Sequence, residues 1–164
     1  MTVVRLERVE PAVALFEQMV EIERNCGLEP FSVELLRECV LRMDTFVCMD
    51  GDTVAGFITV LPNGEYFGEC LYIFNLNVAK RYRRQGLGRR LIQTACATYE
   101  KTHGGMSVTL DVTRTNEAAL ALYRSLGFVE TDYPSENGPG DMVMKVPLVE
   151  LLKNYKNRGG CRQN

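Results

Sequence analysis

The feature that most constrains the fold of this chain is a basic, glycine-containing turn set between a strand-like run and an amphipathic stretch. The residues concerned, 75–91, read NLNVAKRYRRQGLGRRL. After the turn, apolar residues recur at the spacing of a helix with one buried face, at Leu87, Leu91, Ile92, Ala95, Cys96 and Tyr99. The stretch therefore predicts a strand, a tight turn and a helix in immediate succession.

The turn has the composition of an anion-binding site. Gly86 and Gly88 let backbone N–H groups approach a ligand with no side chain in the way, and a helix start favours negative charge. The chain has a formal net charge of −2, yet six of its 19 basic residues lie within 80–90, at Lys80, Arg81, Arg83, Arg84, Arg89 and Arg90. A local basic site on an acidic chain fits a small phosphorylated ligand better than a nucleic-acid duplex. A solvated basic helix start is the alternative explanation.

Hydrophobic periodicity and turn residues predict the element order β-α-α-β-β-β-α-β-α-β-β. Tight turns join the early strands, which are therefore expected to be antiparallel, whereas helical crossings make a parallel pair in the middle. We expect an α/β fold with a mixed, mostly antiparallel central sheet and flanking helices. The expected strands are 2–9, 45–49, 53–61, 69–78, 106–113, 128–133 and 141–146, and the expected helices are 11–27, 32–43 with Ser32 as N-cap, one from 87 ended by Gly104-Gly105, and 116–126.

Length and composition limit the remaining possibilities. The 164 residues are expected to form one domain over 1–148, followed by a tail at 149–164 that begins as a helix and then frays. Six cysteines without a C-x-x-C pair and a single histidine make a metal site unexpected and favour reduced thiols. No apolar run approaches the ~20 residues of a membrane span. We therefore expect a cytoplasmic protein that holds no metal and binds neither membranes nor nucleic acids.

A second segment of the sequence reduces the number of possible ligands. Residues 116–128 read NEAALALYRSLGF. This N-x-x-A-x-x-x-Tyr…Gly-Phe pattern, together with Arg83-x-x-Gly86-x-Gly88, resembles the GNAT superfamily of acyl-CoA-dependent N-acetyltransferases. The element order agrees over nearly the whole chain. Within that superfamily the chain is most similar in appearance to small bacterial protein N-terminal acetyltransferases.

The resemblance implies that acetyl-CoA binds as co-substrate in a V between two splayed parallel strands. Backbone amides of the turn would surround the pyrophosphate, and main chain of the preceding strand would pair with the pantetheine arm. Asn116 would bind that arm from the other side. The implied donor-binding residues are Leu76, Asn77, Val78, Arg83, Arg84, Gln85, Gly86, Leu87, Gly88, Arg89, Asn116 and Tyr123.

Acetyl transfer to an amine needs a neutral amine, donors for the tetrahedral oxyanion and an acid for the leaving thiolate. Tyr123 is the candidate acid, because it lies two helical turns after Asn116 on the same face and occupies the position of the superfamily's sulfur-protonating tyrosine. A core tyrosine beside Leu122 and Leu126 is the alternative. The resemblance assigns the oxyanion donor to the backbone N–H of Val78 or of its neighbour, at a bulge.

The proton acceptor is less well defined. Protein-acetylating relatives carry a glutamate twelve residues before the tyrosine, and here that position is Asp111. Aspartate is one methylene shorter, which favours transfer through a water molecule. Asp111 is otherwise one member of the polar face of a half-buried strand, and Glu69 is an alternative base.

The acceptor is expected to be a protein amine, either an N-terminus or a lysine. The fold would build its pocket from 26–32, 65–67 and 133–141. Acidic residues in or beside these segments suit a cationic acceptor, or are ordinary surface, at Glu29, Glu34, Glu136 and Asp141. The alternatives are a small-molecule amine acetyltransferase for a polyamine, amino sugar or amino acid derivative, and a catalytically idle acetyl-CoA-binding module. Either a monomer or a homodimer is compatible with the sequence.

Overall fold

The computed structural model describes residues 1–27, 30–63, 69–100 and 106–156. The strands are β1 (Thr2–Arg5), β2 (Asp44–Asp50), β3 (Thr53–Asn63), β4 (Cys70–Val78), β5 (Ser107–Thr113), β6 (Val129–Glu130) and β7 (Asp141–Pro147). The helices are α1 (Val13–Arg24), α2 (Val33–Arg42), the 3-10 turn η1 (Lys80–Tyr82), α3 (Leu87–Ala97), α5 (Glu117–Ser125) and α6 (Leu148–Lys156). No described helix is long and apolar enough to cross a membrane.

The strands form one sheet in the order β1-β2-β3-β4-β5-β7-β6. β4 and β5 pair in parallel over Cys70–Ile73 and Ser107–Leu110. The β1–β2, β2–β3, β5–β7 and β6–β7 pairs are antiparallel. The predicted mixed sheet with a central parallel pair is confirmed. The chain divides into two compact units, Met1–Leu61 with Phe74–Ala95, and Pro62–Ile73 with Cys96–Asn164.

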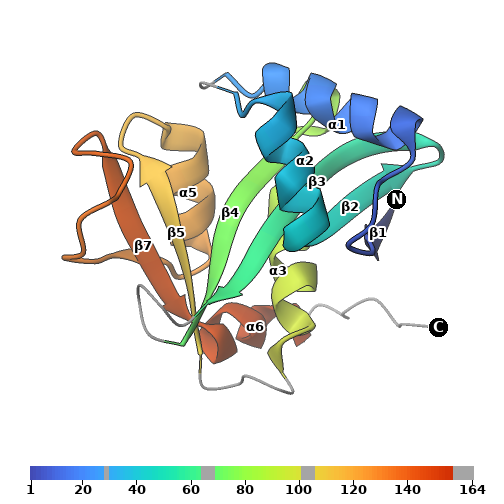
Figure 1. Ribbon diagram of the computed structural model, residues 1–164. Helices are drawn as coiled ribbons and strands as arrows, with labels where there is room; N and C mark the ends of the chain where they lie inside the picture. The colour runs from blue at the N-terminus through green and yellow to red at the C-terminus, as the bar shows by residue number, and fades with distance from the viewer. Residues whose placement is uncertain (28–29, 64–68, 101–105, 157–164) are drawn as a thin grey trace. The chain divides into compact units, whose positions relative to one another are not determined.

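In the first unit, α1 and α2 cover one face of β2 and β3 (Figure 1). Ser32 caps α2 as predicted, because its side-chain oxygen accepts from the Leu35 N–H at 3.1 Å. The apolar faces of both helices meet the sheet in a single cluster of buried side chains. Its members are Phe16, Met19, Ile22, Leu36, Val40, Val47, Val54 and Phe57.

On the opposite face of β3, Gly56 lets β4 approach closely. A Cβ at position 56 would lie 2.7 Å from the Asn77 carbonyl oxygen and 3.2 Å from the Val78 Cα, with Leu91 of α3 at 3.4 Å. Only glycine fits such a contact without moving backbone. Gly56 therefore fixes the last residues of β4, where the basic turn begins.

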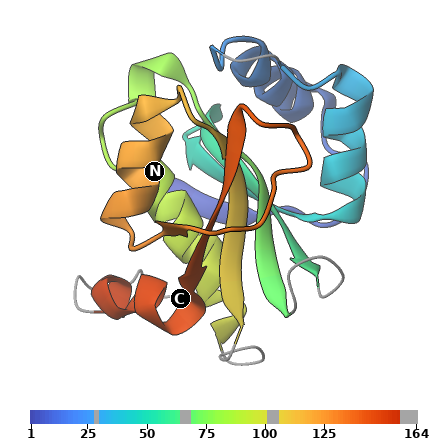
Figure 2. The same cartoon turned by 90° about the vertical axis from the view of Figure 1, so that its left-hand side faces the viewer.

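In the second unit, β5 pairs with β7 from Ser107↔Pro147 to Thr113↔Asp141, and α5 lies against these strands (Figure 2). α5 ends before Gly127, whose φ of 93° suits a glycine helix stop. α6 follows β7 directly, and Leu148, Leu151 and Leu152 are buried.

Two predicted strands are shorter than expected. β1 ends at Arg5 rather than at residue 9, because a tight turn follows in which the Val9 N–H donates to the Glu7 carbonyl at 2.8 Å. β6 covers Val129–Glu130 rather than 128–133. Thr131 still donates its N–H to the Val143 carbonyl at 2.9 Å, but its hydroxyl accepts from the Tyr133 N–H at 3.3 Å, which turns the chain out of the sheet. The expected stop at Gly104-Gly105 lies outside the described residues.

Candidate functional site

The basic turn leaves β4 through η1 and enters α3. Gly86 has φ 78°, and Arg84, at φ 63°, is the one described non-glycine residue with positive φ. This conformation costs a non-glycine residue about 1–2 kcal/mol, so the surrounding structure holds the turn in a particular shape. The first N–H groups of a helix such as α3 have no acceptor within the helix.

The basic side chains of the turn are not equivalent. Arg83 donates Nε to the Val78 carbonyl at 2.9 Å and Nη2 to the Asn25 carbonyl at 3.0 Å. Arg90 donates to the Met1 carbonyl at 3.0 Å, and Gln85 donates to the Arg81 carbonyl at 2.9 Å. Part of the positive charge at the helix start is therefore balanced by carbonyl groups. The crowding of arginines alone is a weaker sign of an anion than the sequence suggested.

The main chain just before the turn has polar side chains in an apolar strand. Leu76 and Val78 are half-buried and Asn75 is buried. The Nδ2 atoms of Asn75 and Asn77 lie 2.9 and 2.6 Å from Glu23 Oε2, and Asn77 also donates to Asn75 Oδ1 at 2.7 Å. A carboxylate on α1 therefore holds both asparagines.

Glu23 is a site residue that the sequence reasoning missed. It is 4% exposed and also accepts the Phe31 N–H, at 3.1 Å. The sequence did contain a sign of this role. Glu23 continues the helical stripe of Phe16, Met19 and Ile22, and so places a charge on the buried face of α1.

The predicted acid, Tyr123, lies on α5, and the predicted ligand-binding residue Asn116 lies at the start of this helix. Tyr123 is 8% exposed and packs its ring 5.6 Å from that of Phe128. Burial raises the pKa of Tyr123 to about 12, so its hydroxyl keeps its proton throughout the neutral range. Asn116 is the N-cap of α5, where its Oδ1 accepts from the Ala119 N–H at 3.2 Å. Asn116 therefore has a structural role in addition to the predicted ligand contact.

Asp111 forms a close pair with Tyr72, another residue that the sequence did not single out. The Tyr72 hydroxyl donates to Asp111 Oδ2 at 2.7 Å, and burial, followed by this hydrogen bond, raises the pKa of Tyr72. Asp111 Oδ1 is buried and has no hydrogen-bond partner among the described residues. The charges of Glu136 and Asp141 also raise the pKa of Tyr72, which places two further carboxylates in the electrostatic surroundings of this pair.

Glu69 occupies a different position. It is exposed just before β4, and its carbonyl accepts from the Ser107 N–H at 3.4 Å. Since Cys70 pairs with Ser107, Glu69 lies about five residues, or ~16 Å, along β5 from Asp111. The structure therefore does not bring the two candidate bases together.

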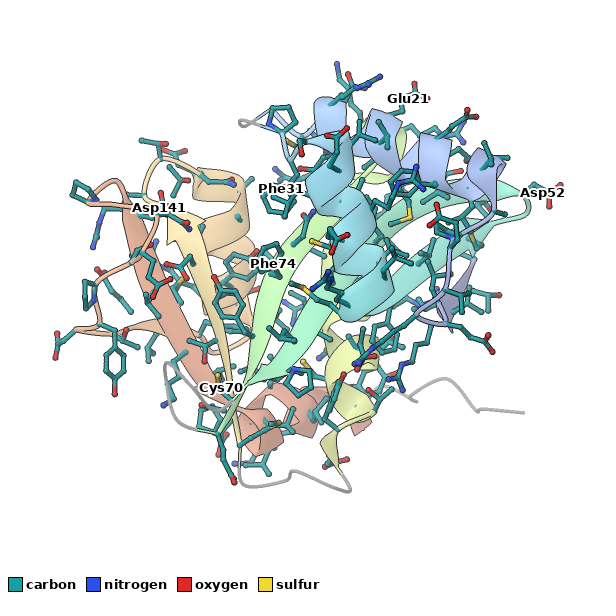
Figure 3. All side chains as sticks on the ribbon, in the orientation of Figure 1. Glu21, Phe31, Asp52, Cys70, Phe74 and Asp141 are labelled. Carbon is teal, nitrogen blue, oxygen red and sulfur yellow. The ribbon has the colours of Figure 1, made fainter. Side chains whose placement is uncertain are left out.

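The acceptor segments are described only in part. Residues 65–67 and Glu29 lie outside the described residues, whereas Glu34 and Glu136 are exposed and Asp141 is half-buried. The Phe31 ring lies 5.5 Å from the Phe74 ring on β4 (Figure 3). In the described ranges no group of three His, Cys, Asp or Glu residues is placed to hold a metal ion. Cys39 and Cys96 are buried on their helices, and burial raises the pKa of Cys39 to about 11.

Residues 16–128 match the acetyltransferase (GNAT) family. The chain belongs to this family. The [ribosomal protein bS18]-alanine N-acetyltransferase of Escherichia coli (strain K12) is 40% identical over 82 residues, which are 46% of this chain and 55% of the relative. N-alpha-acetyltransferase 30 of Schizosaccharomyces pombe is 33% identical over 104 residues, 61% of this chain and 68% of the relative.

Solved structures of GNAT proteins share the fold. The crystal structure of the ribosomal-protein-S18-alanine N-acetyltransferase from Escherichia coli aligns with a TM-score of 0.71 and 28% identity, over 90% of this chain and 93% of that chain. In sequence, however, the chain spans only about half the length of the first curated relatives that it matches. The GNAT match runs from α1 to Phe128 and so contains the buried Glu23, the basic turn and Tyr123.

Proposed function

We propose that this GNAT protein transfers the acetyl group of acetyl-CoA to a primary amine by direct attack in a ternary complex. The observation that carries the amine chemistry is the Asp111 carboxylate, which has one oxygen held by Tyr72 and the other buried without a described partner. A buried, unsatisfied carboxylate oxygen is costly unless a water molecule or a substrate group completes it. Asp111 is therefore placed to accept a hydrogen bond from a water molecule or from the attacking amine.

The donor would be held by the residues around the basic turn. Backbone N–H groups of Arg83 to Arg89 would bind the pyrophosphate, and main chain at Leu76, Asn77 and Val78 would pair with the pantetheine arm. Asn116 would donate its Nδ2 to that arm, because its Oδ1 is used in capping α5. The side chain of Arg83 binds two carbonyl groups, and its backbone N–H donates to the Lys80 carbonyl at 3.3 Å, so Arg83 contributes mainly by shaping the turn.

In the reaction, the neutral amine attacks the thioester carbonyl, and the backbone N–H of Val78 or its neighbour stabilises the oxyanion. The C–S bond then breaks, and Tyr123 gives its proton to the leaving thiolate. The amine nitrogen loses one proton through water to Asp111, which releases it to solvent, and Tyr123 recovers a proton from solvent. Glu69 remains the alternative acceptor of that proton, but its exposed position favours it less.

The acceptor is proposed to be a protein amine, and an N-terminal amine is favoured over lysine. The names of the relatives above describe N-acetylation of an alanine of a ribosomal protein and acetylation of N-alpha groups. A terminal amine with a pKa near 7.7–8.0 needs only about 1 kcal/mol to lose its proton at pH 7, whereas a lysine amine with a pKa of about 10.4 needs ~4–5 kcal/mol.

The test is release of free CoA from acetyl-CoA with three acceptor classes. These are lysine-free peptides with varied N-termini, N-terminally blocked peptides with one lysine, and small amines such as spermidine and an aminoglycoside. We expect release with free N-terminal peptides, and we expect Asp111→Asn to lower it by ~10²-fold. Release only with small amines would support the small-molecule alternative. Tight acetyl-CoA binding without release in any class would support the idle binding module.

The remaining expectations are also proposals. We propose an acetyltransferase domain over 1–148 and a tail over 149–164, whose first turns pack through Leu151 and Leu152. We further propose a cytoplasmic monomer or homodimer that needs no metal and binds neither membranes nor nucleic acids. Gel filtration with light scattering checks the oligomeric state.

A further inference from the structure

Glu23 connects three separate segments of the first unit. It lies near the end of α1, accepts the Phe31 N–H on Oε1 at 3.1 Å, and accepts the side chains of Asn75 and Asn77 on Oε2 at 2.9 and 2.6 Å. Phe31 belongs to the connection between α1 and α2, of which residues 25–27 and 30–32 are described. One carboxylate thus joins this connection to β4.

Burying a carboxylate at a 4% exposed position costs free energy, because the charge loses its contact with water. Its three donors are uncharged, and the described residues include no ion pair of Glu23. An apolar side chain of similar volume would serve packing alone as well or better. The gain from Glu23 is geometric, because hydrogen bonds to a charged acceptor are short and directional.

The start of the same connection is also tied to β4. The Asn25 carbonyl accepts from Arg83, which in turn donates to the Val78 carbonyl. The Phe31 ring packs against the ring of Phe74, the residue that precedes Asn75 in β4 (Figure 3). Both described ends of the α1–α2 connection are therefore anchored to the strand that precedes the basic turn.

We propose that Glu23 is a positioning residue, which holds residues 30–32 and the Asn75 and Asn77 side chains in the arrangement that receives the acceptor amine. This inference rests on the proposed function. It assigns to Glu23 an effect on acceptor binding, exerted through Phe31, and no contact with acetyl-CoA.

The variant Glu23→Gln tests this role sharply. A carboxylate accepts on both oxygens, whereas a carboxamide accepts on one side and donates on the other. The introduced carboxamide would turn its oxygen toward the two asparagines and its NH2 group toward the Phe31 N–H, so the Phe31 anchor would be lost. Glu21 is the matched control, since it is exposed on the same helix and points away from the sheet (Figure 3).

The experiment compares Glu23→Gln with Glu21→Gln in the full chain. We expect hydrogen exchange of the Phe31 amide to be at least tenfold faster in Glu23→Gln, and alkylation of the half-buried Cys26 to be several-fold faster. Alkylation of the buried Cys39, Cys48, Cys70 and Cys96 should not change, which excludes global unfolding. KM for the acceptor peptide should rise about tenfold, the loss expected for one hydrogen bond to a charged group. The Kd for acetyl-CoA should stay within twofold.

A second variant keeps the inference falsifiable if Glu23→Gln folds poorly. When Glu23→Gln is combined with Asn75→Asp, the introduced carboxamide can donate to the introduced carboxylate and turn its oxygen back to the Phe31 N–H. Phe31 exchange should then return to within about threefold of wild type. Two results would overturn the proposal. In the first, Glu23→Gln has the same Phe31 exchange rate and the same acceptor KM as Glu21→Gln. In the second, Phe31 exchanges as fast in the double variant as in Glu23→Gln. If wild type acetylates no amine, the proposed function fails, while the exchange and alkylation data still test the anchor.

Discussion

At the scale of single residues, burial sets the protonation state of Tyr123. A hydroxyl with its pKa raised to about 12 is a permanent donor in any practical assay. Burial is the cause of this shift, and it disfavours the charged tyrosinate form. Thiols ionise near pH 8.5, so the expelled thiolate is a weaker base than the tyrosinate, and the proposed transfer from Tyr123 depends on its hydroxyl being reprotonated from solvent.

Tyr123→Phe is expected to lower kcat by ~10²-fold or more, the usual contribution of a positioned acid, and to leave the Kd for acetyl-CoA within twofold. Because the acid form persists up to about pH 12, the wild-type rate should show no alkaline decline due to Tyr123 between pH 8 and 10.5. Stopped-flow measurement of CoA release across this range checks both points, with Tyr155→Phe on α6 as control. A near-normal kcat for Tyr123→Phe would leave Tyr123 as a core residue.

The Asn116 side chain has two roles that substitutions can separate, capping of α5 and the proposed contact with acetyl-CoA. Asn116→Asp keeps an oxygen that can cap α5 but removes the Nδ2 donor, whereas Asn116→Ala removes both. We expect Asn116→Ala to lose about 1 kcal/mol of unfolding free energy, and both variants to weaken acetyl-CoA binding by several-fold. Urea unfolding and calorimetric titration distinguish these effects. Unchanged affinity in Asn116→Asp would restrict Asn116 to capping.

At the scale of elements, β3 and β4 come into close backbone contact at Gly56 in the first unit. Any side chain there must push the Asn77 and Val78 backbone, since both contacts are to main chain and neither can rotate away. The residues displaced are those proposed to hold the thioester.

Gly56→Ala is therefore expected to cost about 1–3 kcal/mol of unfolding free energy through overpacking and to weaken acetyl-CoA binding as well. Gly140→Ala is the control, because a Cβ at Gly140 meets nothing within 4 Å and its φ needs no glycine. Chemical denaturation of both variants gives the comparison. Equal stability of the two would contradict the close approach of β3 and β4.

Local sequence patterns predicted the helices and strands because each pattern depends on residues that are close together in the sequence. The Ser32 cap, the stripe of α3 and the parallel β4–β5 pair all follow from periodicity and turn residues. The Tyr72–Asp111 pair does not, because it depends on which residues of two distant strands lie in register. The Glu23 contacts also join positions 8 to 54 residues apart, and Arg83 reaches a carbonyl 58 residues away. Such distances along the chain carry no periodic signal.

At the scale of the whole molecule, the half-buried Tyr72 and the buried Tyr123 affect how stability depends on pH. The pKa values of Tyr72 and Tyr123 are both raised in the folded protein, first of all by burial. In the unfolded chain these groups ionise near pH 10. The folded state therefore binds their protons more tightly, so their contribution is fully present below about pH 10 and is lost as pH rises above it.

The unfolding free energy is thus expected to fall above pH 10, by up to ~1.4 kcal/mol per pH unit for each of the two groups. Replacing either tyrosine by phenylalanine should reduce this slope between pH 10 and 11.5. Urea titrations at several pH values measure it, with Tyr155→Phe as control. A slope unchanged in both variants would show that neither tyrosine is coupled to folding.

The bridge from Asn25 through Arg83 to Val78 also bears on protein engineering. Grafting the α1–α2 connection of another GNAT protein onto this scaffold would exchange one anchor of the basic turn along with the intended specificity. A successful chimera should therefore preserve the path of the backbone at residue 25 as well as the grafted side chains. Libraries that begin at residue 26 and leave Asn25 and Arg83 in place should yield more active variants than libraries that begin one helical turn earlier.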